Sequence, residues 1–280
     1  MSLTTSIQDW LAHLTEREHS AIVARRHIAA ETSTDVDAIC VTVSPDVFFA
    51  LPVRTRAGQE LRVGSVLTDA AAVRGYYEAR SGSYVVRDSA QLTSLSTDWY
   101  VFNETQATLL GTGPVGDVDA TGVEWVVSSA VLFPTATDGI RGEICATRHP
   151  MDDVIRGTVG ASPGDALANA RLLDRFSLAL RDAAWEAAAG ELSEGHTMAV
   201  RLDPGGVHMG TGPAEAAAHL ASLAGGAADL TLLCRVATDW YVFAEYLLQL
   251  DAGGSRRLAL LQPVEDGRVV GTFGYGWDEA

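Results

Sequence analysis

The hexapeptide Thr-Asp-Trp-Tyr-Val-Phe occurs twice in the chain, at residues 97–102 and again at residues 238–243. With roughly one chance in twenty at each position, a random match of this length is rare, so the repeat indicates a tandem duplication. The copies begin 141 residues apart, a distance typical of one ordinary domain. Each copy therefore has room for a core of its own.

Length and charge restrict what the chain binds. Its 280 residues suit two domains, and its net charge of −16 argues against nucleic-acid partners and anionic membrane surfaces, since both need clustered cations. All 20 cationic residues are arginine. The absence of lysine excludes Schiff-base chemistry, lysine-bound pyridoxal phosphate and a P-loop.

Histidines and cysteines show no spacing typical of a metal site. The seven histidines form no His-Glu-x-x-His pattern, and Cys40, Cys145 and Cys234 form no Cys-x-x-Cys pair. We therefore expect no metal, no cofactor and no disulfide framework. Without a signal-peptide pattern or an apolar run of about 18 residues, the sequence predicts a cytoplasmic chain.

The pattern of elements predicts helices first and strands afterwards, in both halves. In the first half, helices are expected over residues 6–20, 21–30 and 70–80, with a short capped helix near Asp35. Strands are expected over residues 47–51, 83–94, 95–110, 123–134 and 140–147. In the second half, helical segments over 165–189 and 214–223 precede strands over 230–250, 257–261 and 268–276, and Asp203-Pro204-Gly205-Gly206 is expected to turn a hairpin.

These patterns predict an α+β protein made of two tandem domains. Their expected bounds are residues 1–156 and 165–280, joined by a linker over 157–164 that is rich in glycine and small residues. Matching the helices and the strands separately shows that the second copy is about eight residues shorter between them. The two domains are therefore expected to enclose differently shaped cavities.

The order of elements, seen twice, resembles the nuclear transport factor two-like (SnoaL-like) superfamily. Two short segments add to it: Thr34-Asp35-Val36-Asp37-Ala38 after a helix, and Leu132-Phe133-Pro134 to Gly139 before the last strand. The resemblance implies a cone of helices on a curved antiparallel sheet, with a small apolar molecule bound in its mouth. It also implies that the domains pack on each other as a pseudo-dimer.

Members of this superfamily include cofactor-independent isomerases, dehydratases, cyclases and epoxide hydrolases. The residues that ketosteroid isomerases use fall near Leu51, His27 and Ser129 in the first copy, and near Asp203, Phe176 and Leu258 in the second. Neither copy carries the full set. The resemblance therefore favours a small-molecule site without favouring steroid isomerisation.

The repeated segment offers the first candidate side chains. If it is extended, Asp98, Tyr100 and Glu104 share one face, and Asp239, Tyr241 and Glu245 share the equivalent face. A carboxylate in an apolar pocket has a raised pKa and serves as an acid or base. Two alternatives stay open: Trp and Val of the segment face the core while Asp and Glu lie at solvent-exposed strand ends, or this strand joins the two domains.

The second set of candidates lies on the predicted helices of the first domain. His27 is a candidate acid or base, paired with Glu31 or Glu104, while Tyr76 and Tyr77 are candidate hydrogen-bond donors. The alternatives are a satisfied core histidine and aromatic packing. The full predicted sets are catalytic His27, Glu104 and Tyr77, and ligand-binding Tyr76, Asp98, Tyr100, Ser129, Asp239, Tyr241 and Glu245.

The functional prediction is binding of a small apolar molecule in one or both cones, the first domain being the favoured site. If the chain is an enzyme, it performs acid–base chemistry such as isomerisation, dehydration, cyclisation or epoxide opening. The alternative is a non-catalytic ligand-binding or protein-interaction module.

Overall fold

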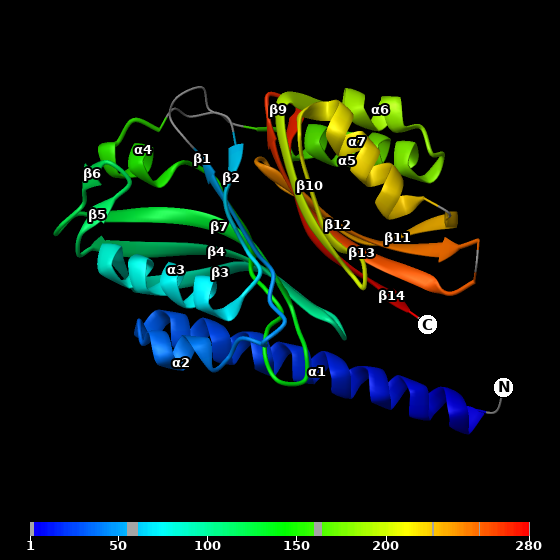
Figure 1. The fold of residues 1–280 in the computed structure, drawn as a ribbon, viewed down its shortest axis with the longest axis horizontal. Coiled ribbons are helices and arrows are strands. Elements are labelled where there is room, and N and C mark those ends of the chain that lie inside the picture. The colour runs from blue at the N-terminus through cyan, green and yellow to red at the C-terminus, as the bar shows by residue number, and fades with distance from the viewer. Residues whose placement is uncertain (1–2, 55–60, 160–163, 226, 252, 280) are drawn as a thin grey trace. The chain divides into compact units, whose positions relative to one another are not determined.

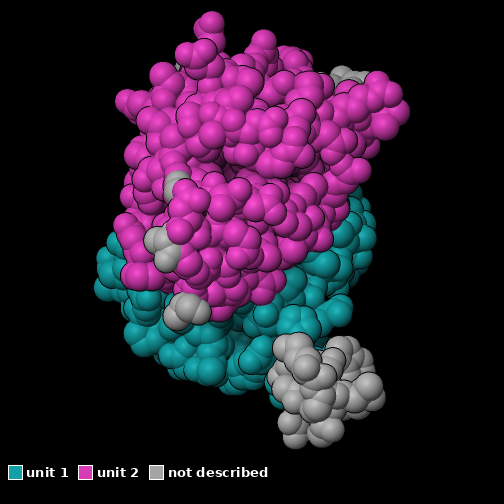
Figure 2. Space-filling model, turned by 90° about the vertical axis from the view of Figure 1, so that its right-hand side faces the viewer, with its two compact units in different colours: residues 1–51, 65–159 teal, residues 52–64, 160–280 magenta. Residues whose placement is uncertain are grey.

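A computed structural model describes residues 3–54, 61–159, 164–225, 227–251 and 253–279. The chain forms two compact units, the first of residues 1–51 and 65–159 and the second of residues 52–64 and 160–280 (Figure 2). Each contains helices and a six-stranded sheet (Figure 1), which confirms the α+β class. The predicted turn at residues 56–58 and residues 160–163 of the predicted linker lie outside the described residues.

Two helices of the first unit, over residues 36–40 and 70–83, begin at an aspartate cap. Asp35 accepts from Ala38 N (3.1 Å) and Asp69 accepts from Ala72 N (2.8 Å). The helices are α1 (Leu3–Ser33), α2 (Val36–Cys40), α3 (Ala70–Ser83) and α4 (Met151–Arg156). The two helices predicted over 6–20 and 21–30 are one continuous helix, because no glycine or proline interrupts this stretch.

The first sheet has the strand order β2-β1-β8-β7-β4-β3. Its strands are β1 (Phe49–Arg54), β2 (Leu61–Leu67), β3 (Tyr84–Ser96), β4 (Tyr100–Gly111), β7 (Glu124–Pro134) and β8 (Ile144–Thr147); β5 (Pro114–Val115) and β6 (Val118–Asp119) form a separate pair. The sheet is mixed, because β1 and β8 are parallel at Ala50 and Ile144, whereas β3, β4, β7 and β8 pair antiparallel.

The second unit repeats this arrangement with the order β10-β9-β14-β13-β12-β11. Its elements are α5 (Ala166–Arg181), α6 (Trp185–Gly190), β9 (Leu192–Asp203), β10 (Gly206–Thr211), α7 (Gly212–Ala224), β11 (Ala227–Ala237), β12 (Tyr241–Leu250), β13 (Ser255–Glu265) and β14 (Arg268–Glu279). β9 and β14 are the parallel pair. The predicted hairpin at Asp203–Gly206 joins β9 to β10.

The repeated hexapeptide forms a tight turn followed by the start of a strand. Thr97 N donates to Tyr100 O, and Thr238 N donates to Tyr241 O, each at 2.9 Å. A helix holds each turn: Ser20 Oγ donates to Asp98 O (3.0 Å), and Asn169 Nδ2 donates to Thr238 O (2.8 Å). The alternation of side chains along this segment therefore starts at Tyr100 and Tyr241, and Asp98 and Asp239 belong to the turns.

The cores of the two units differ. In the second, helices and sheet share one continuous apolar cluster that includes Phe176, Leu180 and Leu258. The first has two clusters, one around Tyr77 and Phe133 and another around Trp125 and Val127. None of the described helices combines the length and the apolar character needed to cross a membrane.

Candidate functional site

The candidate site lies between α1, α3 and β8 of the first unit, where a histidine is fully buried. His27 of α1 is 0% exposed. Its Nδ1 lies 2.8 Å from Thr42 Oγ1, and its Nε2 lies 3.1 Å from the Tyr77 hydroxyl. That hydroxyl lies 2.9 Å from Glu143 Oε2, next to the start of β8. Thr42, His27, Tyr77 and Glu143 thus form one hydrogen-bonded chain, which we call the relay.

The tautomer of His27 follows from the hydrogen bonds of Thr42. The Thr42 hydroxyl donates its single proton to Ile39 O at 2.6 Å, so it accepts from His27 Nδ1. With a proton on Nδ1, neutral His27 has its lone pair on Nε2, facing Tyr77. The imidazole is therefore oriented to accept a proton from the Tyr77 side.

Two proton arrangements satisfy the relay equally well. With Glu143 ionised, Tyr77 donates to Glu143 and a cationic His27 donates to Tyr77. With Glu143 protonated, Glu143 donates to Tyr77 and Tyr77 donates to a neutral His27. The two arrangements hold the same number of protons. They differ in whether one proton lies on the Glu143 carboxyl group or on the His27 imidazole, which Tyr77 connects.

Burial favours the neutral arrangement. It lowers the pKa of His27, an effect that the Glu31 charge opposes and the Arg80 charge reinforces. Burial, together with the charge of Glu31, raises the pKa of Glu143 to about 8. Glu143 is thus a neutral acid at physiological pH, next to a base held neutral.

A second carboxylate next to the relay keeps its charge. Burial is the largest influence on Glu31 and raises its pKa, but the charges of Arg80 and His27, together with hydrogen bonds from Arg80 and Tyr77, lower the pKa by more in sum. The two side chains form a direct ion pair, and the Arg80 guanidinium lies 5.6 Å from the centre of the Tyr77 ring. The site therefore holds one charged carboxylate and one neutral carboxyl group, which is how proteins separate the roles of two acids.

A row of polar side chains separates the two apolar clusters on the sheet. Trp125, Val127, Val131 and Phe133 of β7 belong to these clusters and share one face, so Ser129 between them faces the same interior. Its neighbours across the strands are Thr105 and Thr147, and Cys145 pairs with Val131. We call Thr105, Ser129, Cys145 and Thr147 the polar belt; all four are partly exposed although they face the interior.

Two phenol groups complete the interior. Tyr76 and Tyr84 are partly exposed, and neither hydroxyl has a hydrogen-bond partner among the described residues. Burial is the main reason why the pKa of each is raised, so both keep the proton that they can donate. Burial, with the charges of Glu143 and Glu31, also raises the pKa of Cys145, which is therefore a neutral thiol.

The structure brings some of the predicted residues together and separates others. His27 and Tyr77 are in contact, and Tyr76 packs on Tyr77 with ring centres 5.1 Å apart. Glu104 is not part of this group, because Val101 faces the Tyr77 cluster, so Tyr100 and Glu104 point to the opposite face of the sheet. Thr93 Oγ1 lies 3.5 Å from Glu104 there.

The predicted residues of the second unit do not face its helices. Val242 and Ala244 belong to the core cluster, so Tyr241 and Glu245 point to the other face of β12. Glu245 is buried there and accepts from Arg257 Nη2 at 2.6 Å. Asp239 lies in the turn before β12.

Sequence reasoning missed Glu143, Arg80 and Thr42. An available signal was the alternation Glu143-Ile144-Cys145-Ala146-Thr147, which places Glu, Cys and Thr on one face of a short strand. For Arg80 and Thr42, spacing gives no equivalent signal.

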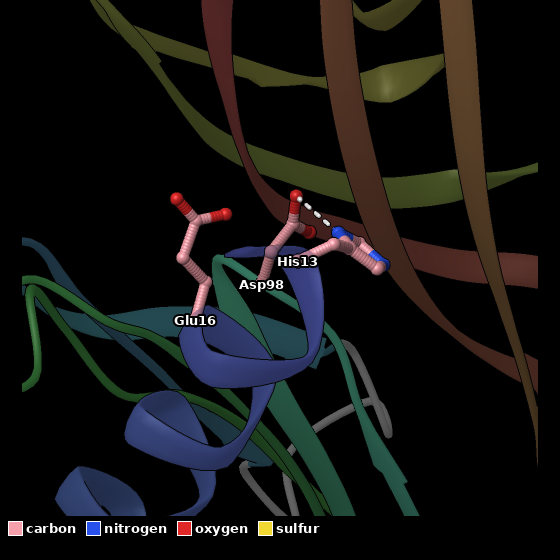
Figure 3. Close-up of side chains that lie close together, drawn as sticks. All are labelled: His13, Glu16 and Asp98. Carbon is pink, nitrogen blue, oxygen red and sulfur yellow. Dashed lines mark ion pairs between the residues drawn. The ribbon is translucent and has the colours of Figure 1, made fainter. Parts of the chain in front are cut away.

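Two groups of described residues offer closely spaced metal ligands. His27, Glu31 and Glu143 are one group, but Arg80 already pairs with Glu31 and Tyr77 lies between His27 and Glu143, so hydrogen bonds satisfy them. The other group is His13, Glu16 and Asp98 (Figure 3), in which His13 Nδ1 lies 3.6 Å from Asp98 Oδ2. Its His13 side chain is 54% exposed, as in many surface ion pairs.

No protein-family model matches the sequence, and no curated protein matches it either. Solved structures do match. A protein from Xanthomonas campestris pv. campestris, assigned as a polyketide cyclase, is 17% identical, covers 51% of this chain and 99% of its own, and has a TM-score of 0.41. A protein from Kribbella flavida, assigned as a ketosteroid isomerase, is 19% identical, covers 40% and 80%, and has a TM-score of 0.34.

A nuclear transport factor two-like protein of unknown function from Mesorhizobium loti is 18% identical, covers 42% of this chain and 97% of its own, and has a TM-score of 0.37. At such identities a likeness concerns the fold alone. Each unit of this chain contains helices and a six-stranded mixed sheet.

Proposed function

We propose that the first unit binds a small, largely apolar molecule over the polar belt and that the relay performs cofactor-independent acid–base chemistry on it. The reaction is of the isomerase, dehydratase, cyclase or epoxide-hydrolase type. Glu143 takes the role that the sequence assigned to Glu104, since Glu143 faces the interior with His27 and Tyr77. The proposed ligand carries an oxygen atom, to which Tyr76 and Tyr84 donate.

The single observation that carries this proposal is the hydrogen-bonded chain of His27, Tyr77 and Glu143, along which one proton can be shared. A neutral carboxyl group is a general acid, and its ionised form is a general base. Here the proton moves between Glu143 and His27 through Tyr77 without any side chain being displaced. Proton transfer to and from a ligand needs a pair of this kind, with pKa values moved towards neutrality.

The partial exposure of interior groups supports binding. The polar belt lines the sheet side. Tyr76 and Tyr84 are partly exposed, and both lie close enough to Glu143 and Cys145 for those groups to contribute to the raised pKa of each phenol. Apolar clusters lie at both ends of the belt. A molecule that is apolar at both ends with a polar middle matches this order.

The second candidate is a non-catalytic binding module. It is favoured by the depth of His27 and Tyr77, both 0% exposed, because a relay that no ligand reaches is a structural network. In that case the belt binds a ligand and no proton is transferred.

Deuterium exchange into cyclohexanone in D₂O separates the two candidates. The catalytic proposal expects the protein to accelerate exchange at the carbons next to the carbonyl, followed by ¹H NMR. Glu143→Gln should lower the acceleration about 100-fold, the usual size of a general acid–base contribution. Glu104→Gln, on the opposite face of the sheet, is the matched control and should leave it unchanged.

Binding of cyclohexanone without exchange, seen as NMR shifts at Ser129 and Cys145, would support the non-catalytic module. Neither binding nor exchange with cyclohexanone would contradict both candidates for this ligand class.

A further inference from the structure

A surface pocket touches the relay from the side opposite to Glu143. It is formed by α1, the residues that follow α2, and the turn before β8. Its lining includes His19, Val41, Thr42, Asp138 and Gly139. Thr42 is the one residue of the relay among them, and it accepts from His27 Nδ1.

The pocket reaches Thr42 because the chain passes close to it. Ile140 N donates to Thr42 O at 3.0 Å, and a Cβ on Gly139 would lie 2.5 Å from that oxygen, so only glycine allows this approach. Thr42 keeps 8% exposure, whereas His27 and Tyr77 have none. A water-sized molecule in the pocket thus lies against Thr42, the residue whose hydroxyl is bonded to Nδ1 of His27.

Proton acceptors line the same pocket. His19 supplies an imidazole and Asp138 a carboxylate, and neither has a hydrogen bond or ion pair with another described residue. Both are exposed. A proton that leaves the relay here is therefore taken up by a side chain or by bulk solvent.

We propose that this pocket is the proton-exchange port of the relay, with Thr42 as the gate between His27 and solvent. The Thr42 hydroxyl turns from Ile39 O towards a water in the pocket. It transfers its hydroxyl proton to that water. The Nδ1–H bond of His27 breaks as a new O–H bond forms on Thr42, and the resulting hydronium ion protonates His19, Asp138 or bulk water. A His27 that has accepted a proton at Nε2 is left neutral, as the other tautomer.

The port rests on the proposed function and deepens it, because it lets the relay release a proton to solvent while a ligand covers the belt. Its test does not depend on that function, since hydrogen exchange of His27 needs no ligand. Failure of the port and failure of the catalytic proposal are therefore distinguishable.

The experiment is the exchange rate of the His27 ring N–H with water, measured by NMR magnetisation transfer in the ¹⁵N-histidine-labelled full chain. Thr42→Val, which keeps the shape and removes the hydroxyl, should slow exchange about tenfold, leaving only local opening as a route. Val41→Trp should slow it about fivefold, because Val41 is 74% exposed at the pocket and a larger side chain covers it without changing the relay.

Leu92→Trp is the matched control: Leu92 is 55% exposed on β3 and does not line the pocket, so the rate should not change. The ring N–H of buried His196 in the second unit serves as the check on folding. If Thr42→Val shifts His27 to its other tautomer, the exchange rate of the His27 ring N–H in Val41→Trp is the measurement that tests the port. An unchanged His27 rate in Val41→Trp would overturn the port and place exchange on the Glu143 side.

Discussion

At equivalent positions, the interior of the first unit carries polar and ionisable side chains where the second unit carries mostly apolar ones. Ser20 and Asn169 hold the two repeated turns, so counting along the helices places Phe176 at the position of His27 and Leu180 at that of Glu31. Strand register places Thr272 at the position of Glu143, and Leu258 at that of Ser129.

This difference shows what the duplication kept and what it changed. The turn and the sheet order are the same in both units, and a helix side chain donates to each turn, to Asp98 O in the first unit and to Thr238 O in the second. The interior of the first unit holds the polar belt between two apolar clusters and the relay within one of them, whereas the helix-facing interior of the second unit is one apolar cluster. The second unit thus shows how this fold is stabilised when it carries no relay.

The second unit has a small polar group of its own. His196 Nε2 lies 3.0 Å from Thr272 Oγ1, which also accepts from Gln262 Nε2 at 3.1 Å. Burial alone lowers the pKa of His196 to about 4. No carboxylate belongs to this group, so it lacks the acid that the relay has.

The largest expected effect comes from placing a carboxyl group in the second unit at the position that corresponds to Glu31, the charged carboxylate next to the relay. Leu180→Glu puts a carboxyl group at a position that is 4% exposed and surrounded by apolar side chains. We expect a loss of roughly 3 kcal/mol or more in unfolding free energy, measured by denaturant unfolding. Leu180→Met is the control and should cost less than about 1.5 kcal/mol; equal losses would contradict the contrast.

The next effect is the pH dependence of the first unit. The pKa of Glu143 is raised from 4.5 to about 8 in the folded state, so the unfolded chain releases this proton first. Its contribution to stability is full below pH 4.5 and is lost as the pH rises through about 8. The loss has a limiting slope of about 1.4 kcal/mol per pH unit.

Glu143→Gln should remove this slope, measured as unfolding free energy between pH 5 and 8. Glu104→Gln is the control for a buried glutamate on the other face of the sheet. A slope that persists in Glu143→Gln would show that another group carries it.

The second unit should respond to pH in the opposite direction. The pKa of His196 is lowered to about 4 from 6.5, so the unfolded chain binds this proton more readily. Stability from this group is full above pH 6.5 and falls as the pH drops towards about 4. His196→Gln should flatten this part of the profile more than His219→Gln, at a partly exposed position, does; equal effects would contradict the assignment.

The smallest expected effect is removal of the central phenol. Tyr77→Phe keeps the ring contacts with Phe49 and Tyr76 but breaks the link between His27 and Glu143. We expect a cost of about 1–3 kcal/mol in denaturant unfolding, because two buried groups lose a partner. The Nδ1 proton of His27 should remain, because Thr42 still accepts it; its loss would contradict the assigned tautomer.

The sequence predicted the parts of the fold that local rules decide. The repeat, the caps Asp35 and Asp69 and the order of elements all follow from short patterns. The parallel pairing of β1 with β8 did not, because it joins segments about 95 residues apart and no local signal encodes it. That pairing places Glu143 near Tyr77.

The site was therefore predicted in part. His27 and Tyr77 were identified from helix positions, but Glu104 was predicted as the acid on the expectation that its face of the strand lines the pocket. The turn at Thr97–Trp99 and the alternation from Tyr100 place Glu104 on the opposite face of the sheet. Which face of a strand meets the helices depends on packing, which the sequence pattern of a strand buried on both faces does not reveal.

The most direct test of the shared proton is a ¹³C NMR titration of the glutamate carboxyl groups in the full chain, with Glu143 assigned through Glu143→Gln. The relay predicts that the Glu143 signal titrates with a midpoint of about 8, while ¹⁵N shifts show His27 neutral with its proton on Nδ1. A Glu143 midpoint near 4.5, the ordinary value, would contradict the relay.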